Sequence, residues 1–420
     1  MRACLPAGRD DSVDIMDDAV NWLFLDLNAY FASVEQQVQP ALRGKPVAVI
    51  PMMADNTCCI AASYEAKAYG IKTGTRVGDA KKLCPGLHLV VAGHAFYVRY
   101  HHMIVEAVES CVPVASVLSI DEMICRLTGS QREIPNAVAL ARKIKQTIAA
   151  RVGDYLRCSI GLGPNRYLSK VASDMQKPDG LTILRLGELP RILYGLELND
   201  LPGIGPRMEA RLHQKRIFTM EQLCRLSVSQ MRDIWGGIVG ERFRAWLHGE
   251  EVDEPETHRS SVGHSHVLPP EMRTMHGAFQ VVKKLTSKAA VRLRRIGYWA
   301  KGMSLSVQFL GGSEDWSDKT KLMEAQDTPT LLKAVEKLWA QVPAGKPLWV
   351  GVTFFPIVPV DQHTPSLFEN PKQEKLSLVM DQINEKYGRD TAYFGELHDA
   401  REQAPTRIAF TQIPDISEVD

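Results

Sequence analysis

The chain has 420 residues, of which 45% are hydrophobic and 7% aromatic, and its formal net charge is +1. This length allows two to four domains, each with its own core, and the low aromatic content argues against a carbohydrate or lipid specialist. No apolar run is long enough to span a membrane, and acids stand where a signal peptide would be apolar, so we expect a cytoplasmic protein without membrane association. The eight cysteines lack metal-ligand spacing, which is typical of free thiols in a reducing compartment.

The N-terminal part of the chain predicts a tail followed by a mixed α/β unit. Residues 1–20 are interpreted as a tail. From 21 to 186, short β-rich runs alternate with helical spacing, which is typical of an α/β arrangement. We expect strands at Trp22–Leu27, Pro46–Ile50 and Cys158–Leu162, a hairpin at Val114–Leu127 and a helix at Pro135–Val152.

The remainder of the chain predicts a helical module, a linker, an α+β unit and a tail. Residues 187–249 contain short helical patterns separated by glycines, and residues 250–258 are acidic, contain a proline and lack an apolar face, as a linker would. Residues 259–358 follow a β-α-β-β-α-β order, with a long helix expected at Glu271–Ile296. Residues 359–420 are interpreted as a polar tail that contains a helix at Lys375–Tyr387.

Three carboxylates from two distant apolar runs form the main candidate site. Asp26 ends an apolar strand, and a helix pattern starts within a few residues, where anionic ligands commonly bind. Asp121 and Glu122 are consecutive, so both can serve one site only at the turn of the hairpin, where the pleat is broken. Such oxygens suit a pair of Mg²⁺ ions, which clamp the attacking and leaving oxygens of a phosphoryl transfer. The alternative is a turn that is merely rich in acids.

Five segments resemble, in order and spacing, motifs of the Y-family (translesion) DNA polymerases, the group that includes DNA polymerase IV and UmuC. They are DLNAYFASVE, ASYEAKAYGIKTG, SIDE, CSIGLGPNRYLSKVASDMQKPDG and DLPGIGPRMEARL, and the match extends from Asn21 to Ile357. The resemblance implies a multidomain α+β right hand: a ferredoxin-like palm, small fingers inserted at about 40–95, a helical thumb with a helix-hairpin-helix, and a β-α-β-β-α-β little finger. It implies template-directed, low-fidelity DNA synthesis past damaged bases, without proofreading.

The resemblance also implies roles for individual residues. Asp26, Asp121 and Glu122 match the catalytic carboxylates, which with the Leu27 carbonyl would bind two Mg²⁺ ions, and Mn²⁺ is an expected substitute. Phe31 matches the steric gate that excludes a 2′-hydroxyl; the alternative is an ordinary core aromatic. The expected nucleotide contacts are the backbone amides of Asn28, Ala29, Tyr30 and Phe31 and the side chains of Tyr64, Lys67 and Lys177. At Lys67 the family usually has an arginine, whose bidentate fork a lysine lacks.

Two regions are predicted to contact DNA, and each has a purely structural alternative. Gly203, Ile204 and Gly205 open a helix in the helix-hairpin-helix pattern, in which backbone N–H groups bind phosphate without reading sequence; the same pattern fits an ordinary helix start. The segment from Arg259 to Lys301 has one acid, Glu271, so its helix or the adjoining strands are expected to contact the DNA backbone, with a steep salt dependence. The alternative is a solvated face. The helix candidates are Lys283, Lys284, Lys288, Arg292, Arg294 and Arg295.

The C-terminal segment contains one candidate partner motif. Thr364–Phe368 (TPSLF) resembles a clamp-binding peptide, so the expected partners of a monomer are a sliding clamp, primer–template DNA and dNTPs. The alternative is a staple that docks the tail on its own domain. Asp381–Gly395 resembles C-terminal segments of the UmuC branch and suggests no mechanism.

Two other functions remain open at this point. One is a catalytically inactive, polymerase-like DNA-repair scaffold, against which the three carboxylates argue. The other is a nucleotidyl cyclase, which shares a palm and two metals but has no use for a helix-hairpin-helix.

Overall fold

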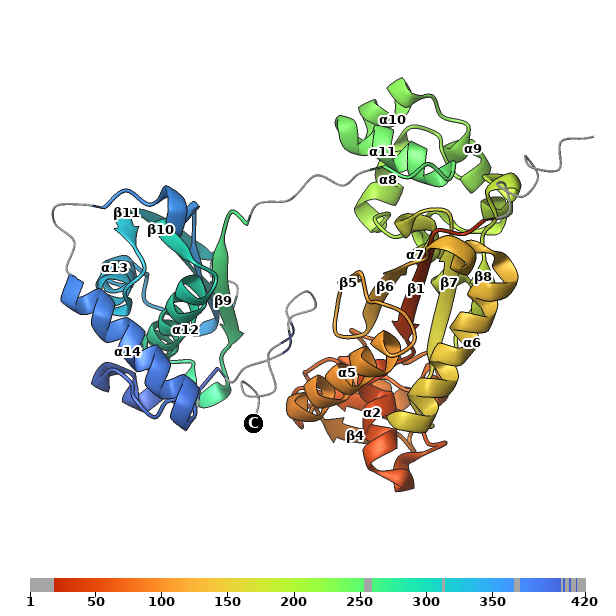
Figure 1. Cartoon of the computed structure of the whole chain (residues 1–420). Helices are drawn as coiled ribbons and strands as arrows, with labels where there is room; N and C mark the ends of the chain where they lie inside the picture. The colour runs from red at the N-terminus through yellow and green to blue at the C-terminus, as the bar shows by residue number, and fades with distance from the viewer. Residues whose placement is uncertain are drawn as a thin grey trace, which may run out of the picture. The chain divides into compact units, whose positions relative to one another are not determined.

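The computed structural model describes residues 19–252, 259–311, 314–365, 371–401, 403–404, 408 and 413. The chain divides into two compact units, which we describe separately (Figure 1): the first comprises 1–254 with 408–420, and the second comprises 255–407. Within the described ranges, no helix combines the length and hydrophobicity needed to span a lipid bilayer.

A five-stranded sheet forms the centre of the first unit. Its strand order is β5-β6-β1-β7-β8, and β1 is antiparallel to both of its neighbours. All six residues of β1 are buried, as expected for an apolar run in the middle of a sheet covered on both faces. The strands are β1 (Trp22–Leu27), β5 (Ser116–Val117), β6 (Glu122–Arg126), β7 (Cys158–Gly163) and β8 (Leu181–Ile183).

Alternate residues of β1 face different helices. The leucines of β1 join the main core of the unit, to which α5 and α6 contribute. Trp22 and Phe24 form a second, small cluster with Ile124 on the opposite face, which α7 covers. Asp26 has the same parity as Trp22 and Phe24, so it lies on the α7 side of the sheet. The three helices are α5 (His94–Glu109), α6 (Ile134–Arg151) and α7 (Arg166–Met175).

A small three-stranded sheet with the order β3-β2-β4 lies within 40–95, the range in which the fingers are expected. It has its own core, which includes Ile50, Ile71 and Val77. The hydroxyl of Ser63 caps α3 by accepting a hydrogen bond from the Ala66 N–H. The elements of this region are β2 (Val47–Ile50), β3 (Ala61–Ala62), α3 (Tyr64–Lys67), α4 (Val77–Leu83) and β4 (His88–Val91). Helix α2 (Tyr30–Val38) precedes them and packs in the main core.

The expected helical module, or thumb, contains four short helices around a shared apolar core. Leu212, Met220, Met231 and Phe243 are buried together in it. Capping boxes at Thr219 and Ser227 mark two of the helix starts, as the sequence pattern requires. The helices are α8 (Pro206–Gln214), α9 (Met220–Cys224), α10 (Val228–Trp235) and α11 (Ile238–Leu247).

The second unit has the predicted β-α-β-β-α-β order. Its sheet has the order β11-β10-β12-β9, with antiparallel neighbours throughout, and β13 pairs with β10. The long helix begins at Met275, four residues later than expected, because the Thr274 hydroxyl caps it after a short 3-10 turn at Pro270–Met272. The elements are β9 (Val262–Val267), α12 (Met275–Arg295), β10 (Tyr298–Phe309), β11 (Trp316–Ala325), α13 (Thr328–Trp339), β12 (Pro347–Phe354) and β13 (Ile357–Pro359).

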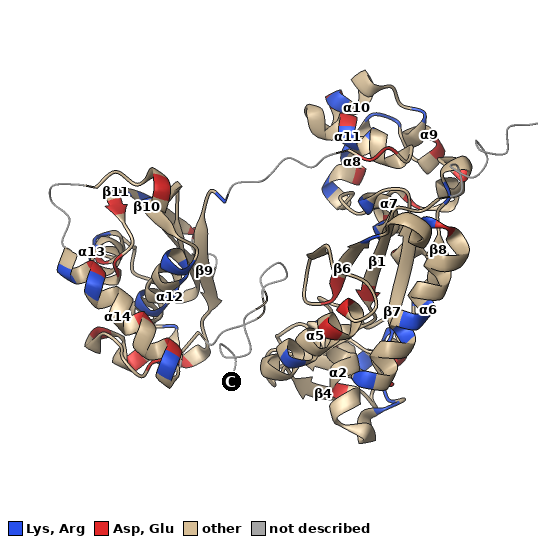
Figure 2. Ribbon diagram, in the orientation of Figure 1, with Lys and Arg blue, Asp and Glu red and all other residues tan. Residues whose placement is uncertain are grey.

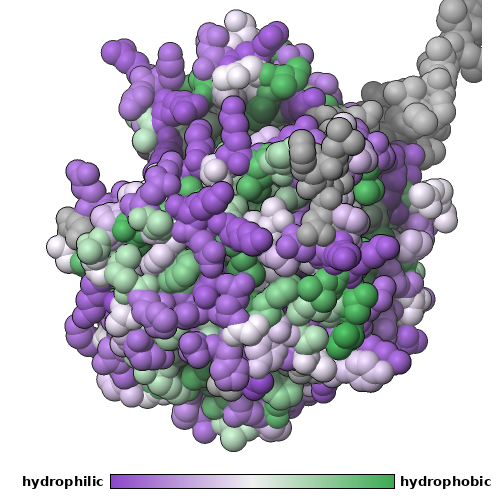
Figure 3. Space-filling model, turned by 90° about the vertical axis from the view of Figure 1, so that its left-hand side faces the viewer, coloured by the Kyte–Doolittle hydropathy of each residue, from purple (hydrophilic) through white to green (hydrophobic). Residues whose placement is uncertain are grey.

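Part of the expected C-terminal tail packs on this second unit. Helix α14 (Pro371–Tyr387) contacts α13, and the 3-10 segment Gly395–Ala400 contacts α12. Several apolar side chains of α14 stay exposed, including Leu376 and Val379. On the face drawn in Figure 3, hydrophobic and hydrophilic groups alternate in small patches. The segment 371–404 therefore packs on the helices of this unit, which themselves cover its sheet, and does not form a free tail.

Candidate active site

Asp26 and Glu122 lie opposite each other across two neighbouring strands. They are paired residues in the antiparallel ladder of β1 and β6, and Figure 2 shows acidic residues at this end of the sheet. Asp26 is 5% exposed, while Glu122 is half-buried. The paired position brings two carboxylates from distant parts of the chain to one point, since opposite residues of such a ladder have their Cβ atoms about 5 Å apart.

Asp121 lies in the bend that precedes β6, as expected for consecutive acids that share one site. The pleat of β6 begins only at Glu122, so the two side chains are not forced to opposite faces. The Asp121 carbonyl accepts a hydrogen bond of 2.8 Å from the Leu27 N–H, which ties the bend to the end of β1. The Ser119 hydroxyl donates to Asp121 Oδ1 at 2.6 Å. Burial, and then the charges of Asp26 and Glu122, raise the pKa of the Asp121 carboxyl, which a nearby cation would oppose.

Two lysines from the α7 side of the sheet form ion pairs with these carboxylates. Lys170 Nζ lies 2.6 Å from Asp26 Oδ2, 2.7 Å from Glu122 Oε1 and 3.1 Å from Asp174 Oδ1. Lys177 Nζ lies 2.8 Å from Asp26 Oδ2 and 2.8 Å from Asp174 Oδ1. Burial lowers the pKa of both lysines, but the negative charges around them, led by Asp26, outweigh burial and raise it. Both ammonium groups are therefore charged at neutral pH.

The donor set fits a hard divalent cation. Carboxylate oxygens are the ligands that Mg²⁺ prefers in proteins, and one cationic nitrogen already touches oxygens of Asp26 and Glu122. In the part of the chain that the structure describes, no three His, Cys, Asp or Glu side chains converge closely enough to ligate one ion as they stand. In this arrangement the Ser119 hydroxyl engages Asp121, and the Lys170 ammonium lies between the oxygens of Asp26 and Glu122.

Phe31 lies at the start of α2, next to the carboxylate end of β1. Its ring stacks on Tyr97, with centroids 4.2 Å apart and an interplanar angle of 12°. The Tyr97 hydroxyl donates to Glu35 Oε1 at 2.6 Å, and Tyr30 donates to the Tyr97 carbonyl at 2.6 Å. Phe31 is only half-buried, unlike Tyr30 and Tyr97. The buried tyrosines thus hold the Phe31 ring in one orientation with part of its surface open.

Asn28 has a different role from the one expected. Its N–H donates to the Arg157 carbonyl at 2.8 Å, so this amide is engaged within the fold. Its buried side chain accepts from the Asp179 N–H at 2.7 Å and donates to Ser159 at 3.2 Å. Ala29, with φ 47°, then turns the chain into α2. The first N–H groups of a helix lack intrahelical partners. The backbone amides of Ala29, Tyr30 and Phe31 therefore remain the predicted contacts to the nucleotide.

Tyr64 and Lys67 lie on α3, and Lys67 Nζ is 4.3 Å from the centre of the Tyr64 ring. Burial raises the pKa of Tyr64, Lys177 lowers it, and Asp26 and Asp174 raise it. These electrostatic influences put Tyr64 in the same neighbourhood as the carboxylate centre. Tyr64 on α3 and the carboxylates at the end of β1 therefore lie in one region.

Comparison with known proteins decides the family. Residues 25–174 match the impB/mucB/samB family, and residues 259–367 match the C-terminal domain of that family. A DNA polymerase IV of Moorella thermoacetica is 32% identical over 379 residues, which cover 87% of this chain and 93% of the relative. The chain belongs to the Y-family of DNA polymerases. Members of this family use divalent metal ions, in agreement with the carboxylate centre.

Other Y-family comparisons agree with this assignment. A DNA polymerase IV of Pelotomaculum thermopropionicum is 31% identical over 87% of this chain and 92% of the relative. Among solved structures, a Y-family DNA polymerase chimera matches with a TM-score of 0.69 and DinB from Sulfolobus solfataricus with 0.53, each at 22% identity over 81% of this chain and 99% of the other. These structural similarities show the fold, and they confirm the predicted multidomain α+β right hand of the Y-family.

The predicted helix-hairpin-helix segment of this Y-family chain lies between a 3-10 turn at Leu198–Asp200 and the start of α8. Gly205 is the N-cap of α8, and Gly203 has φ 90°, which favours glycine. A Cβ atom on Gly205 would meet nothing within 4 Å, so this backbone is open to approach. Ile204, in contrast, is 3% exposed, and its N–H donates to the Leu201 carbonyl. Ile204 anchors the turn in the thumb core and does not offer its N–H to DNA.

The basic helix α12 buries three of its six predicted DNA contacts. Lys283, Lys284 and Arg294 are buried, and segment 371–404 supplies their partners. Lys284 Nζ lies 2.6 and 2.7 Å from the Asp390 carboxylate oxygens, Lys283 lies 3.8 Å from Glu396, and Lys288 donates to the Ala404 carbonyl at 2.7 Å. These contacts engage the side chains within the fold, and no local pattern around α12 indicates that acids about 100 residues later in the chain cover them.

Arg294 shows how completely that face is covered. Its guanidinium makes two bonds with the Asp381 carboxylate and a third with the Gln326 carbonyl. Arg292 and Arg295, from the last turn of α12, remain predicted DNA contacts. The adjoining strands, which were the other expectation, carry the exposed side chains of Lys301, Lys319 and Lys321.

Lys170, Asp174 and Ser119 also take part in the contacts around the carboxylates, although the sequence pattern did not lead us to expect them in the site. A signal for the first two was present, because Lys170 and Asp174 are four residues apart and so share one face of α7, which ends at Met175, two residues before Lys177. Only the structure shows that this face points to the even-numbered residues of β1.

Proposed function

We propose that this protein is a translesion DNA polymerase whose carboxylate centre adds deoxynucleotides to a primer end with two Mg²⁺ ions, for which Mn²⁺ can substitute. The observation that carries the proposal is the pairing of Asp26 with Glu122 around one cationic nitrogen, with Asp121 in the adjacent bend. Two such ions, when bound, stabilise charge on the transferring phosphoryl group and on the attacking and leaving oxygens. Asp26, Asp121, Glu122 and the Leu27 carbonyl would hold them.

The chain's own residues orient the nucleotide around this centre. The amides of Ala29, Tyr30 and Phe31 at the start of α2 suit triphosphate oxygens, since a helix N-terminus favours anions. The side chains of Lys177, Tyr64 and Lys67 would add positive and polar contacts to the triphosphate. A triphosphate that takes over the Lys177 ammonium would also free Asp26 from one of its two ion pairs.

Phe31 would act as the steric gate against ribonucleotides. Its stacking on Tyr97, and the bond from Tyr97 to Glu35, leave the ring little freedom to rotate away from a 2′-hydroxyl. Such a gate excludes a ribonucleotide because the 2′-hydroxyl collides with the ring. The ring must therefore be held rigidly in place. The buried pair Tyr97 and Glu35 supplies that support.

DNA would be held by the thumb and by the little finger. In the thumb, the amides of Gly203 and Gly205 are the candidates for phosphate contacts. In the little finger, Arg292, Arg295 and the strand lysines 301, 319 and 321 replace the buried residues of α12 as candidates. Since phosphate contacts release counterions, binding should weaken steeply with salt.

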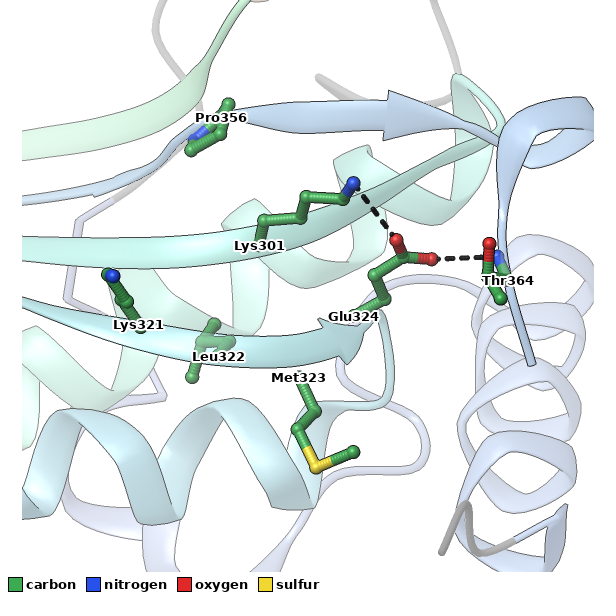
Figure 4. Close-up of a pocket in the computed structure, with 7 residues that line it drawn as sticks. All are labelled: Lys301, Lys321, Leu322, Met323, Glu324, Pro356 and Thr364. Carbon is green, nitrogen blue, oxygen red and sulfur yellow. Dashed lines mark hydrogen bonds and ion pairs between the residues drawn. The ribbon is translucent and has the colours of Figure 1, made fainter. Parts of the chain in front are cut away.

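The peptide Thr364–Phe368 is the proposed sliding-clamp contact. Residues 366–368 lie outside the described residues, but the start of the peptide is held in place (Figure 4): Thr364 N–H donates to Glu324 Oε2 at 3.0 Å, and Lys301 Nζ lies 3.1 Å from Glu324 Oε1. The His363 ring stacks on Trp299 with centroids 3.6 Å apart. Lys301, Glu324 and Thr364 border a cavity of about 490 Å³. We further propose that the protein acts as a cytoplasmic monomer.

Primer extension tests the proposal. Wild-type protein with Mg²⁺, dNTPs and primer–template DNA should extend the primer, also across an abasic site, whereas Asp26→Asn should lose about 100-fold or more of the rate because a metal ligand is gone. A gel-shift assay should show that Asp26→Asn still binds the same DNA. Wild-type protein that binds DNA but never extends it would support the inactive scaffold. Cyclic nucleotide formation without salt-sensitive DNA binding would support the cyclase.

A further inference from the structure

Lys170 occupies the position of a cation between two carboxylates of the proposed metal centre. Its ammonium nitrogen contacts Asp26 Oδ2 and Glu122 Oε1 at once, at 2.6 and 2.7 Å. Mg²⁺ would bind such oxygens at about 2.0–2.1 Å. An ammonium and a metal ion cannot both fit between the same two oxygens, so binding of one excludes the other from that position.

The side chain of Lys170 is well supported in this position. It is 18% exposed, and its nitrogen lies 5.0 Å from the centre of the Phe24 ring, on the α7 face of β1. A buried set of carboxylates without a cation is destabilised by desolvation and mutual repulsion. The lysine relieves both effects before any metal arrives.

A second acceptor for the same lysine lies one helical turn away. Asp174 Oδ1 is 3.1 Å from Lys170 Nζ, and the two residues are four apart on α7. Lys170 can therefore give up Asp26 and Glu122 and keep an ion pair with Asp174. The displacement needs only a rotation of one flexible side chain.

We propose that Lys170 is a built-in counter-cation that holds the metal centre ready when no metal is bound and that the incoming divalent ion displaces toward Asp174. The inference rests on the proposed carboxylate metal centre and adds a regulation of its metal affinity. Lys170 competes with the ion and so weakens its binding. In return, the centre keeps its shape and charge balance between catalytic cycles.

Direct metal binding tests this inference without any measurement of polymerase activity. Mn²⁺ is titrated into the full-length protein, and free Mn²⁺ is followed by electron paramagnetic resonance. Lys170→Met keeps the aliphatic stem over Phe24 and removes the charge, so it should bind Mn²⁺ at least about tenfold more tightly than wild type, since one positive charge a few ångströms from the ion is gone. The matched control is Lys143→Met, which removes an exposed charge on α6 and should bind as wild type does.

A second measurement uses the wild-type protein and so does not depend on the folding of a variant. In a sample with ¹³C,¹⁵N-labelled lysine, the NMR signal of the Lys170 side chain should shift as Mg²⁺ is added, while that of Lys143 stays in place. Equal Mn²⁺ affinities of wild type and Lys170→Met, or a Lys170 signal that ignores saturating Mg²⁺, would overturn this inference alone. Absence of any Mn²⁺ or Mg²⁺ binding by the wild type would overturn the metal centre together with it.

Discussion

The guanidinium of Arg294 in α12 forms a two-bond ion pair with the carboxylate of Asp381 in α14, with N–O distances of 2.7 and 2.8 Å. The Arg294 side chain is 3% exposed, so the pair is desolvated on the arginine side. It joins the helix that was expected to face DNA to the segment that was expected to be a tail. The stability of the little finger therefore depends on residues that lie outside the matched family domain, which ends at 367.

We expect Asp381→Asn to lower the free energy of unfolding of this unit by about 1–3 kcal/mol, because a buried guanidinium then lacks its charged partner. The measurement is denaturant unfolding of the full-length protein. Glu385→Gln, an exposed change on the same helix, is the control and should be neutral. Equal stability of Asp381→Asn and wild type would mean that α14 does not stay on α12 in solution.

Neutralising the acids that cover α12 should increase non-specific DNA binding. In a double variant, Asp390→Asn and Glu396→Gln, Lys284 and Lys283 lose their partners and become available to phosphate. We expect a tighter Kd for random-sequence duplex DNA and a steeper dependence of log Kd on log salt, by about one unit for each further phosphate that a lysine neutralises. An unchanged salt slope would show that the lysines stay buried even without their partners.

Replacing Phe31 with Ala should open the active site to ribonucleotides. Incorporation of a ribonucleotide relative to the matching deoxynucleotide should rise about tenfold or more, since loss of only about 1.4 kcal/mol of discrimination is tenfold. Single-nucleotide insertion kinetics measure it. Tyr97→Phe, which removes only the hydroxyl that bonds Glu35, should give a smaller rise in the same direction. Unchanged sugar selectivity in Phe31→Ala would remove the gate role.

His264 should make the little finger sensitive to acid. Burial, then Lys288 and Arg292, lower the pKa of His264 to about 4, against an ordinary value of about 6.5. Below about pH 6.5, His264 binds a proton in the unfolded chain, but in the folded unit it does so only near pH 4. The free energy of unfolding therefore falls as the pH drops from about 6.5 to about 4. The urea midpoint of His264→Gln should fall less than that of wild type between pH 6.5 and 4. An NMR titration of His264 with a midpoint near 6.5 would contradict the prediction.

Deleting Thr364–Phe368 should reduce only the part of DNA synthesis that a sliding clamp stimulates. Glu324→Gln, which weakens the anchor of Thr364 and His363, should reduce that stimulation to a smaller extent. Primer extension with and without the clamp separates the effects. An equal loss in both conditions would indicate that the peptide docks on its own domain.

The order of elements and the carboxylates were predictable from the sequence because both depend on local patterns. A few residues are enough to predict an apolar strand that ends in Asp26. The same holds for a hairpin with Asp121 and Glu122 at its turn. The partners of the basic residues were not predictable in this way. Lys284 and Asp390 are 106 positions apart, and only tertiary packing decides whether a charged helix face meets water, DNA or the chain's own acids.

Asn28 and Ile204 show the same limit on a smaller scale. Both lie in segments predicted to bind phosphate groups, yet the N–H of each donates to a carbonyl of the fold, Asn28 to Arg157 and Ile204 to Leu201. A motif indicates which backbone segment approaches a ligand. It does not indicate which amide in that segment is already used by the fold.

Because successive side chains of β1 point to opposite faces of the sheet, the length of this strand cannot change by one residue without consequence. Trp22 and Phe24 face the same side as Asp26, while the leucines between them fill the main core. Inserting or deleting a single codon within this strand would reverse every side chain beyond the change, placing a leucine among the lysines and a carboxylate among the core residues. Substitutions that preserve polarity are tolerable there, but frame-preserving insertions of one residue are not.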